Sequence, residues 1–535
     1  MRILVLQLCR LGDILQTTPM LRGLRNIHPD AEIVIVPHEA FAHVPVPGAL
    51  YDRWHPFPAA TIGSRLATEP SSWRRQVAAV REFVDALGAE PFDLTLNLTH
   101  SDLSGLLAAA IPSREVRGGL VAPDRTRVVQ GDWMTYFWSS QTCRELGCFN
   151  LVDIHNWTAG VPADGLPLEI DVGEAAERRV ESWLVDQGLA DRPVIAVQLG
   201  ASDERKRWPP ERFADAVSRV PPELGTIVLV GARAERPLAE RFKARARRSV
   251  HDAVGVTTIP ELAALLGRCR LLATNDTGTM HVAAATGTRV VDVSTGPVFV
   301  HETGPYGDQH LVIEPAIDCF PCTAGCSCSH IACRDWIDPR DVGALLAHAL
   351  GAGQLPRPER ARILRGSFLP SGRLDYGVIS PAGPAAAEAV RQALATVWER
   401  TLPIPPSTRL PRRGRTPPPT TLDGAGGSDR SGELGSLTAR VEALATLARA
   451  VPQATVERRN ELAAGITAGL QALQLQAELV PAAKPFLAFL KVGLDSVTEN
   501  AVENVSARYE RELLDAARRL RMLADVLREP MPRSA

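Results

Sequence analysis

The sequence predicts an α/β protein: two doubly wound domains with parallel sheets that face a crevice, followed by an α-helical C-terminal extension. Three observations support this prediction. Short apolar runs alternate with helical segments in two successive units, which is typical of parallel sheets covered by helices. A stretch rich in proline and glycine then interrupts the pattern. After it, apolar residues recur every three and four positions, as in packed helices.

The domain boundaries follow from these changes in pattern. At 535 residues the chain is too long for a single core. We predict a first domain at 1–170 and a second at 171–350. We further predict a proline- and glycine-rich linker at 351–432 and a helical module at 433–530.

The first domain opens with a strand that leads into a helix. Its predicted strands are "MRILVLQL" (1–8), "EIVIV" (32–36) and "DLTLNL" (93–98). These runs are apolar throughout, as expected of parallel strands that are covered on both faces. The helical segment 10–25 contains Pro19, which we expect to kink it. Ser101 or Asp102 can cap the small-residue helix that follows the third strand.

The second domain repeats the alternation from about residue 190. Its predicted strands are "VIAVQL" (194–199), "TIVLV" (226–230), "RLLATN" (270–275) and "RVVDVS" (289–294). The predicted helices between and around them are "PERFADAVSRV" (210–220), "RPLAERFKARA" (236–246), "IPELAALLGRC" (259–269) and "TMHVAAATG" (279–287). Two such units in tandem place a crevice at the carboxyl ends of two sheets, which is where open α/β folds bind ligands.

The C-terminal third has a different character. The stretch 351–432 is predicted to be extended and solvated. The apolar seam that follows consists of Val502, Val505, Tyr509, Leu513, Ala516, Leu520, Leu523 and Leu527. Its spacing suits helix-on-helix packing. We therefore expect a helical bundle or a module through which the chain forms a homo-oligomer; the alternative is an arm that docks a partner.

Composition and charge exclude some functions. The formal net charge of −2 gives no overall attraction to nucleic acid. The N-terminal residues have too short an apolar run for a signal peptide, and no stretch approaches the ~20 apolar residues of a membrane span. We therefore expect a cytoplasmic protein, with a peripheral role at the membrane left open.

Three stretches carry the chemistry. The turn after the first strand has a single glycine, Gly12, followed at once by the carboxylate of Asp13. Dinucleotide-binding folds place several glycines at such a turn, because a phosphate must approach the backbone there. A negative charge is therefore unexpected at this position.

The second stretch is "NDTGTMHVAAATG" (275–287). Asp276 ends a strand, and Thr277 and Gly278 begin a helix whose free N–H groups suit a phosphate. A carboxylate beside a diphosphate indicates a group that holds sugar hydroxyls. The simpler interpretation is that Asp276 caps the helix and that His281 is a core histidine.

The third stretch, "LGASDERKRWPPERF" (199–213), follows the first strand of the second domain. Ser202 offers a hydroxyl and Lys206 a point charge suited to a diphosphate. The alternative is a solvated basic loop.

The order of these motifs resembles glycosyltransferase family 9, the heptosyltransferase family. The resemblance rests on "R-x-G-D" with a proline six positions after the aspartate, then "GAS…K-R-W-P-P-E-R-F" and "N-D-T-G-x-x-H-x-A-A-A-x-G". It extends over "PYG" (305–307) and "DPRDVGALLAHAL" (338–350) and ends near residue 350. The last 180 or so residues are not explained by it.

The resemblance implies a GT-B fold of two Rossmann-like domains, one for the acceptor and one for an activated sugar such as ADP-heptose. It implies inverting transfer by direct displacement, without a catalytic metal. Asp13 matches the general base, and Arg10 and Gly12 lie beside it on the acceptor side. The matching donor positions are Ser202, Lys206, Asp276, Thr277, Gly278 and His281.

Two positions depart from the family pattern or match it loosely. The chain has Gln198-Leu199 where the family often has Asn-Pro, so the turn there is expected to differ. Glu235 is aligned with the acidic residue that holds the nucleotide ribose.

Five cysteines lie within fifteen residues: Cys319, Cys322, Cys326, Cys328 and Cys333. A cluster in a cytosolic chain indicates metal binding or redox chemistry rather than disulfides. Many family members have a similar segment, and some bind iron through it. Four thiolates suit a structural iron or zinc ion equally, with Cys319, Cys322, Cys333 and one of the other two as ligands. The alternative is a loop of reduced thiols.

The leading hypothesis is therefore an enzyme that transfers a heptose or related sugar to a bacterial surface glycan, such as the lipopolysaccharide core, at the cytoplasmic face of the inner membrane. Its partners would be a nucleotide-sugar donor and a glycolipid or protein acceptor. Two alternatives stay open: a protein O-heptosyltransferase, and a non-catalytic scaffold of the same fold whose helical tail recruits partners.

Overall fold

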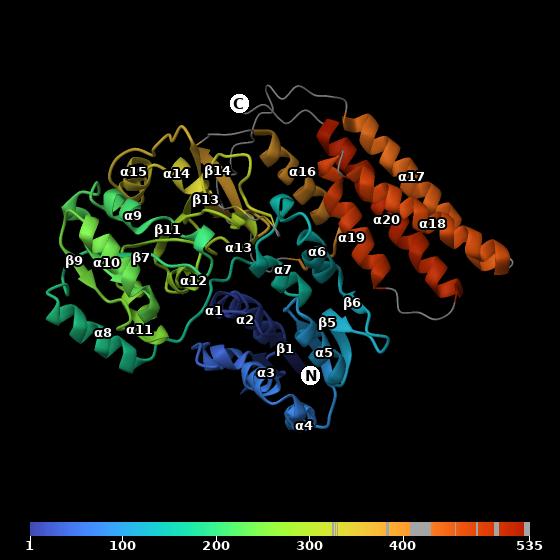
Figure 1. Cartoon of the computed structure of the whole chain (residues 1–535), viewed down its shortest axis with the longest axis horizontal. Helices are drawn as coiled ribbons and strands as arrows, with labels where there is room; N and C mark the ends of the chain where they lie inside the picture. The colour runs from blue at the N-terminus through green and yellow to red at the C-terminus, as the bar shows by residue number, and fades with distance from the viewer. Residues whose placement is uncertain are drawn as a thin grey trace.

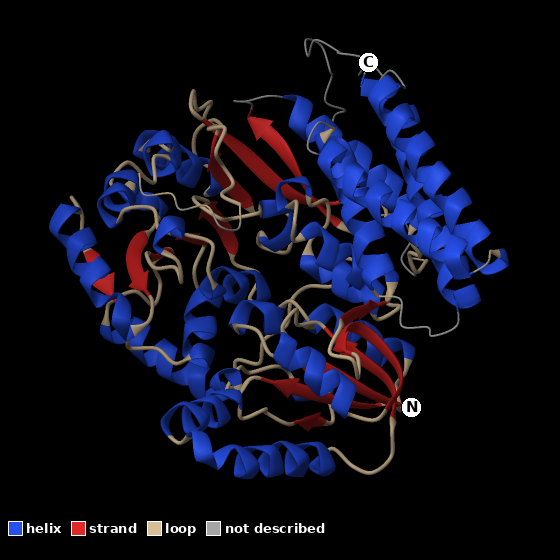
Figure 2. Cartoon of the chain, turned by 45° about the vertical axis from the view of Figure 1, so that its right-hand side comes forward, coloured by secondary structure: helices blue, strands red, loops and turns tan. Residues whose placement is uncertain are grey.

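The computed structural model describes residues 1–323, 326, 328, 330–380, 385–406, 430–454, 456–477, 480–496 and 502–528. Two α/β domains lie next to each other, and a group of long helices flanks the first of them (Figure 1). Figure 2 shows the two sheets as separate layers with the helical extension beside them. The predicted fold class is confirmed.

The first domain contains a mainly parallel sheet. Its strands are β1 (Arg2–Gln7), β2 (Glu32–Pro37), β3 (Arg53–Trp54), β4 (Phe92–Asn97), β5 (Ser113–Val121) and β6 (Arg127–Gln130). Its helices are α1 (Leu11–Leu15), α2 (Thr18–Ile27), α3 (Ala59–Thr68), α4 (Trp73–Ala86), α5 (Asp102–Ala110), α6 (Asp132–Ser140) and α7 (Leu151–Thr158). In the described chain the strand order is β3-β2-β1-β4-β5-β6, and only the β5–β6 pair is antiparallel.

The predicted kink at Pro19 is wrong, because the chain ends one helix and begins another there. The hydroxyls of Thr17 and Thr18 donate to the carbonyls of Ile14 and Leu15, at 2.6 and 2.7 Å, and so satisfy the end of α1. Pro19 then lies in the first turn of α2, where a missing N–H costs no hydrogen bond.

The second domain contains the larger sheet. Its strands are β7 (Val194–Gln198), β8 (Thr226–Val230), β9 (Val250–Asp252), β10 (Leu271–Thr274), β11 (Arg289–Val293), β12 (Leu311–Pro315), β13 (Ala361–Phe368) and β14 (Leu374–Ser380). Its helices are α8 (Glu174–Asp186), α9 (Pro210–Val217), α10 (Arg236–Arg245), α11 (Ile259–Gly267), α12 (Gly278–Ala285), α13 (Val300–Thr303), α14 (Cys333–Trp336) and α15 (Pro339–Ala349). The strand order is β14-β13-β12-β11-β10-β7-β8-β9.

Much of the predicted linker at 351–432 is folded, which corrects that prediction. β13 pairs antiparallel with β12, and β14 pairs antiparallel with β13, so this segment extends the second sheet by a hairpin. Its apolar residues are buried on the sheet, as Ile363 and Tyr376 show. Two parts of that range, 381–384 and 407–429, lie outside the described residues.

The extension consists of α16 (Ala385–Thr401), α17 (Arg430–Ala450), α18 (Val456–Ala477), α19 (Lys484–Asp495) and α20 (Val502–Arg528). The seam residues Leu513, Ala516, Leu520 and Leu523 are fully buried within the chain, where α20 runs along α17. α18 packs closely on α17 because Gly469 has no side chain; a Cβ there would lie 2.3 Å from Leu444. This part of the chain is a helical bundle, and its seam is covered by its own helices.

The bundle shares a core with the first domain. The Trp398 ring of α16 lies 5.2 Å from that of Tyr136 in α6, and 4.6 Å from that of Phe486 in α19. The N–H of Val129 on β6 donates to the buried hydroxyl of Ser496 at 2.9 Å. The extension is therefore an integral part of the first domain, beside α6 and β6 (Figure 1).

The carboxylate of Asp153 links the two domains. Asp153 of α7 is fully buried and accepts from the Tyr306 hydroxyl and from the Leu374 N–H, both at 3.0 Å. Nearby, Arg144 forms two hydrogen bonds with Glu302 of the second domain. These contacts fix the first domain to β14 and to the loop before β12.

None of the helices in the described ranges is both long enough and apolar enough to cross a membrane.

Candidate functional site

The predicted site residues lie where the two domains meet. α1 of the first domain faces α12 of the second. A Cβ on Gly12 would lie 2.5 Å from the His281 ring, and Leu11 lies against Gly278. Gly12 is therefore required by close packing, because only a residue without a side chain lets the two helices approach this far.

A hydrogen bond between domains accompanies this contact. The guanidinium of Arg10 donates to the Ser202 hydroxyl at 2.8 Å. The backbone N–H of Arg10 donates to the Asp13 carboxylate at 2.9 Å, so Asp13 also caps its own helix. The structure thus brings the predicted residues Arg10, Asp13 and Ser202 together where the two domains meet.

Lys206 and Asp276 form an ion pair at the end of the second sheet. Lys206 Nζ lies 2.5 Å from Asp276 Oδ2, and Asp276 is buried. The cation thus offsets the cost of burying the carboxylate. Asp276 immediately precedes Thr277, the N-cap residue of α12. Within the described residues, the Thr277 side chain caps no backbone N–H of this helix. The first N–H groups of this eight-residue helix therefore point toward the same space.

A buried asparagine fixes the two donor loops to each other. The Asn275 amide donates to the carbonyl of Leu199 at 3.0 Å and accepts from the Trp208 N–H at 2.9 Å. It thereby holds the loop of Ser202 and Lys206 against the start of α12. The motif that contains Asn275 does not by itself reveal this role; the position of Asn275 directly before Asp276 was the available signal.

Glu235 lies at the same sheet edge, in the turn before α10. Its carboxylate accepts from the Ala232 N–H at 2.9 Å and from the Gln198 amide at 3.1 Å. Burial raises the pKa of Glu235 above its ordinary value, and these two donors oppose that shift. Gln198, which departs from the family pattern, therefore orients Glu235. Gly200 faces this carboxylate so closely that a Cβ there would overlap it.

His281 is buried between the acidic groups of both domains. Burial lowers its pKa below the usual value; the charges of Asp276 and Asp13 act against this, and that of Lys206 reinforces it. No described residue forms a hydrogen bond with His281 Nδ1. Its ring is packed on Gly12 across the domain boundary.

The cysteine segment packs against the donor loop. Arg205 donates to the Cys326 carbonyl at 3.0 Å, and the Cys322 N–H donates to the Gly296 carbonyl at 3.1 Å. Burial and the neighbouring thiols of Cys326 and Cys333 raise the pKa of Cys322 to about 11.

The thiols of the segment therefore lie near one another. In the part of the chain that the structure describes, no three histidine, cysteine or acidic side chains are placed to hold one metal ion. The structural iron or zinc ion therefore stays a prediction, with a loop of reduced thiols as the alternative.

Comparison with known proteins agrees with this arrangement. The family model described as glycosyltransferase family 9 (heptosyltransferase) matches residues 80–331. The match covers the second half of the first domain and most of the second domain, including Ser202, Lys206 and the α12 motif.

Individual relatives are more distant. Lipopolysaccharide heptosyltransferase 1 of Pseudomonas aeruginosa is 25% identical over 333 residues, which are 60% of this chain and 86% of that protein. Lipooligosaccharide heptosyltransferase 2 of Haemophilus influenzae is 27% identical over 130 residues, so that the match covers 23% of this chain and only 37% of that relative. A solved family 9 structure from Veillonella parvula has a TM-score of 0.46 and 26% identity, and the match covers 58% of this chain and 85% of that one. Residues 80–331 therefore match the model of glycosyltransferase family 9, the heptosyltransferase family, which the order of the motifs predicts.

Proposed function

We propose that this protein is an inverting heptosyltransferase. It transfers a heptose or related sugar from a nucleotide-sugar donor, ADP-heptose, to a hydroxyl of a bacterial surface glycan such as the lipopolysaccharide core. The observation that supports the proposal is the contact of α1 with α12. Around this contact, the buried His281 is influenced by the charge of Asp13 from one domain and by those of Lys206 and Asp276 from the other.

Direct displacement at the anomeric carbon needs a base on one side of the sugar. The Arg10 N–H holds Oδ2 of Asp13. The carboxylate is thereby oriented to take the proton of the attacking acceptor hydroxyl through its other oxygen. The hydroxyl oxygen forms the new glycosidic bond as the bond to the diphosphate breaks. A base in this role contributes about 10²–10⁴-fold to the rate.

The opposite side of the sugar must accept the charge of the departing diphosphate. Lys206 supplies a cation there, and the first N–H groups of α12 at Thr277 and Gly278 supply oriented dipoles. Diphosphate binding would compete with Asp276 for the Lys206 ammonium and free that carboxylate for sugar hydroxyls. The unpartnered Nδ1 of His281 offers one further polar contact. Glu235, oriented by Gln198, is placed for the ribose hydroxyls.

The acceptor is assigned to the first domain, with Arg10 as the residue nearest the base. The names of the relatives from Pseudomonas and Haemophilus, a lipopolysaccharide and a lipooligosaccharide heptosyltransferase, support a lipopolysaccharide-type acceptor. We place the reaction at the cytoplasmic face of the inner membrane. A protein acceptor is the alternative within the same chemistry. The convergence of Asp13, Lys206 and Asp276 opposes a non-catalytic scaffold, which needs no such arrangement.

The test compares Asp13→Asn with Lys206→Ala. Asparagine can still accept from the Arg10 N–H, so the helix cap survives and only the base is lost. We expect turnover to fall about 10²–10⁴-fold with unchanged donor affinity. Lys206→Ala should instead weaken the binding of ADP-heptose measured by calorimetry. Normal turnover in Asp13→Asn would contradict the proposal.

A further inference from the structure

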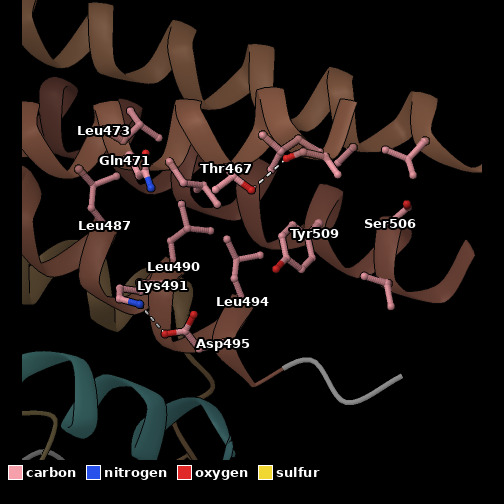
Figure 3. A pocket seen from close by; sticks show the side chains of 16 residues that line it. Thr467, Gln471, Leu473, Leu487, Leu490, Lys491, Leu494, Asp495, Ser506 and Tyr509 are labelled. Atoms are coloured by element: carbon pink, nitrogen blue, oxygen red, sulfur yellow. Dashed lines mark hydrogen bonds and ion pairs between the residues drawn. The ribbon is translucent and has the colours of Figure 1, made fainter. Parts of the chain in front are cut away.

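The helical extension contains a pocket of about 530 Å³. This is within the ~300–1,000 Å³ range of small-molecule sites, which are lined mainly by apolar side chains. Its walls come from α18, α19, α20 and the end of α17, and Figure 3 shows its aliphatic side chains in a row. Leu487, Leu490 and Leu494 line it from three successive turns of α19. Ligand sites in helical bundles are built in this way, from side chains on facing helices.

The pocket extends along α18. On α18 its lining runs from Ala463 to Leu473, ten residues, or roughly 15 Å of helix. The hydrocarbon core of a bilayer is about 30 Å thick, so one leaflet is about 15 Å deep. The apolar wall therefore has the length of one acyl chain of a membrane lipid.

Polar groups lie at the edge of the apolar row. Lys491 and Asp495 pair at 2.6 Å, and both side chains are more than half exposed, at 55% and 59%. Figure 3 shows this pair beside Leu490 and Leu494. Such an exposed pair contributes little to stability, so Lys491 can exchange its partner for an anionic group at low cost. An apolar slot with a cation at its edge fits a chain that ends in an acidic or polar head.

The pocket is fixed to the acceptor-side domain. α19 packs against α6 and β6, and the hydroxyl of Ser496, next to Asp495, accepts from the Val129 N–H. A molecule held in this pocket is therefore held by the domain to which the acceptor is assigned.

We propose that the pocket binds one acyl chain of a lipid, and that the lipid is the glycolipid acceptor. The assignment to the acceptor rests on the proposed function; the binding of an acyl chain does not. The extension thereby selects acceptors that carry a lipid, which is a specificity separate from the chemistry at Asp13.

The test uses dodecanoate as the probe and the full-length protein. Ala463 and Ala464 are adjacent exposed residues of α18, but only Ala463 lines the pocket. Ala463→Trp should therefore block the pocket, while Ala464→Trp serves as a matched control of similar stability. By calorimetry we expect saturable binding of dodecanoate, weakened about tenfold or more in Ala463→Trp and within about twofold of normal in the control. Shorter fatty acids should bind about fourfold more weakly for each methylene group removed.

Three outcomes would overturn the acyl-chain site: no saturable binding of dodecanoate, equal binding by the two variants, or a dimer that Ala463→Trp converts to a monomer. The last would make the pocket an interface between copies. A second arm measures heptose transfer to an intact glycolipid and to the same glycan after deacylation. Ala463→Trp should raise KM only for the intact glycolipid; equal KM values would remove the acceptor from the pocket while leaving the acyl-chain site in place. Absence of any transfer would count against the proposed function alone.

Discussion

Replacing Asp153 with asparagine should remove a pH dependence of stability that arises at the junction of the two domains. Burial raises the pKa of Asp153 to about 7, against the donors Tyr306 and Leu374. Because the carboxyl holds its proton more tightly in the folded state, it stabilises the protein most below the unfolded pKa of ~3.9. That contribution is lost as the pH rises through about 7.

The size of the effect follows from the shift. At pH 5, two units below the folded pKa, the bound proton stabilises the fold by roughly 2.7 kcal/mol relative to the ionised form, at 1.36 kcal/mol per unit. Asparagine keeps both hydrogen bonds, since its oxygen can accept from Leu374 and its amide can donate to the Tyr306 oxygen. The free energy of unfolding of the native protein should therefore fall by about 3 kcal/mol between pH 5 and 8 relative to Asp153→Asn.

Urea unfolding at a series of pH values measures this difference. Tryptophan fluorescence is a suitable signal because Trp157 lies one turn away on α7. Small proteins have a urea dependence of ~1–3 kcal/mol/M and larger ones a steeper one, so the midpoints of the two proteins should move apart by less than about 1 M across that range. Parallel pH profiles would refute the reasoning, because they would mean that Asp153 is ionised at neutral pH or exposed at the junction.

Gly12→Ala should lower turnover by at least about tenfold while the protein stays folded, because the new Cβ would lie 2.5 Å from the His281 ring and separate α1 from α12. Kinetics together with circular dichroism would check this, and an active Gly12→Ala enzyme would count against the contact. Trp398→Ala should destabilise the protein by about 3–5 kcal/mol, since it removes a fully buried ring from the shared core. Hydrogen exchange should then rise in both α6 and α19; a change confined to the extension would show that the two parts are independent. For the segment 319–333, elemental analysis of purified protein decides between one iron or zinc per chain and a loop of reduced thiols.

Four strands of the second domain, β7, β8, β10 and β11, could be predicted because they are continuous apolar runs. The predicted strands 194–199 and 226–230 correspond to β7 and β8. Both are buried on two faces of the sheet, which requires the continuous apolar sequence that identified them as strands. The candidate site was predicted from the order of the motifs, and its residues in the second domain converge because parallel strands end at the same edge of a sheet. What the sequence could not supply was the pairing of Arg10 with Ser202, 192 positions apart.

The hairpin of β13 and β14 was missed because proline and glycine dominate the composition of the surrounding stretch. Within it, Ile363 and Leu364 on one strand and Tyr376 and Val378 on the other flank a turn that contains Gly372, which is a hairpin signal at short range. A composition average over 351–432 conceals this signal. The seam of α20 was recognised, but a helical repeat by itself does not distinguish a partner within the chain from a second copy.

The placement of Trp398 against Tyr136 has a consequence for the order in which the protein is made. The first domain leaves the ribosome early, yet its aromatic core is closed by residues translated about 240 positions after Trp157, at ~5–20 residues per second. For some tens of seconds the nascent first half must keep an apolar face uncovered while the second domain emerges and folds beside it. A nonsense mutation near the end of the gene therefore damages the beginning of the protein, and the truncated chain becomes a substrate for chaperones rather than a smaller enzyme.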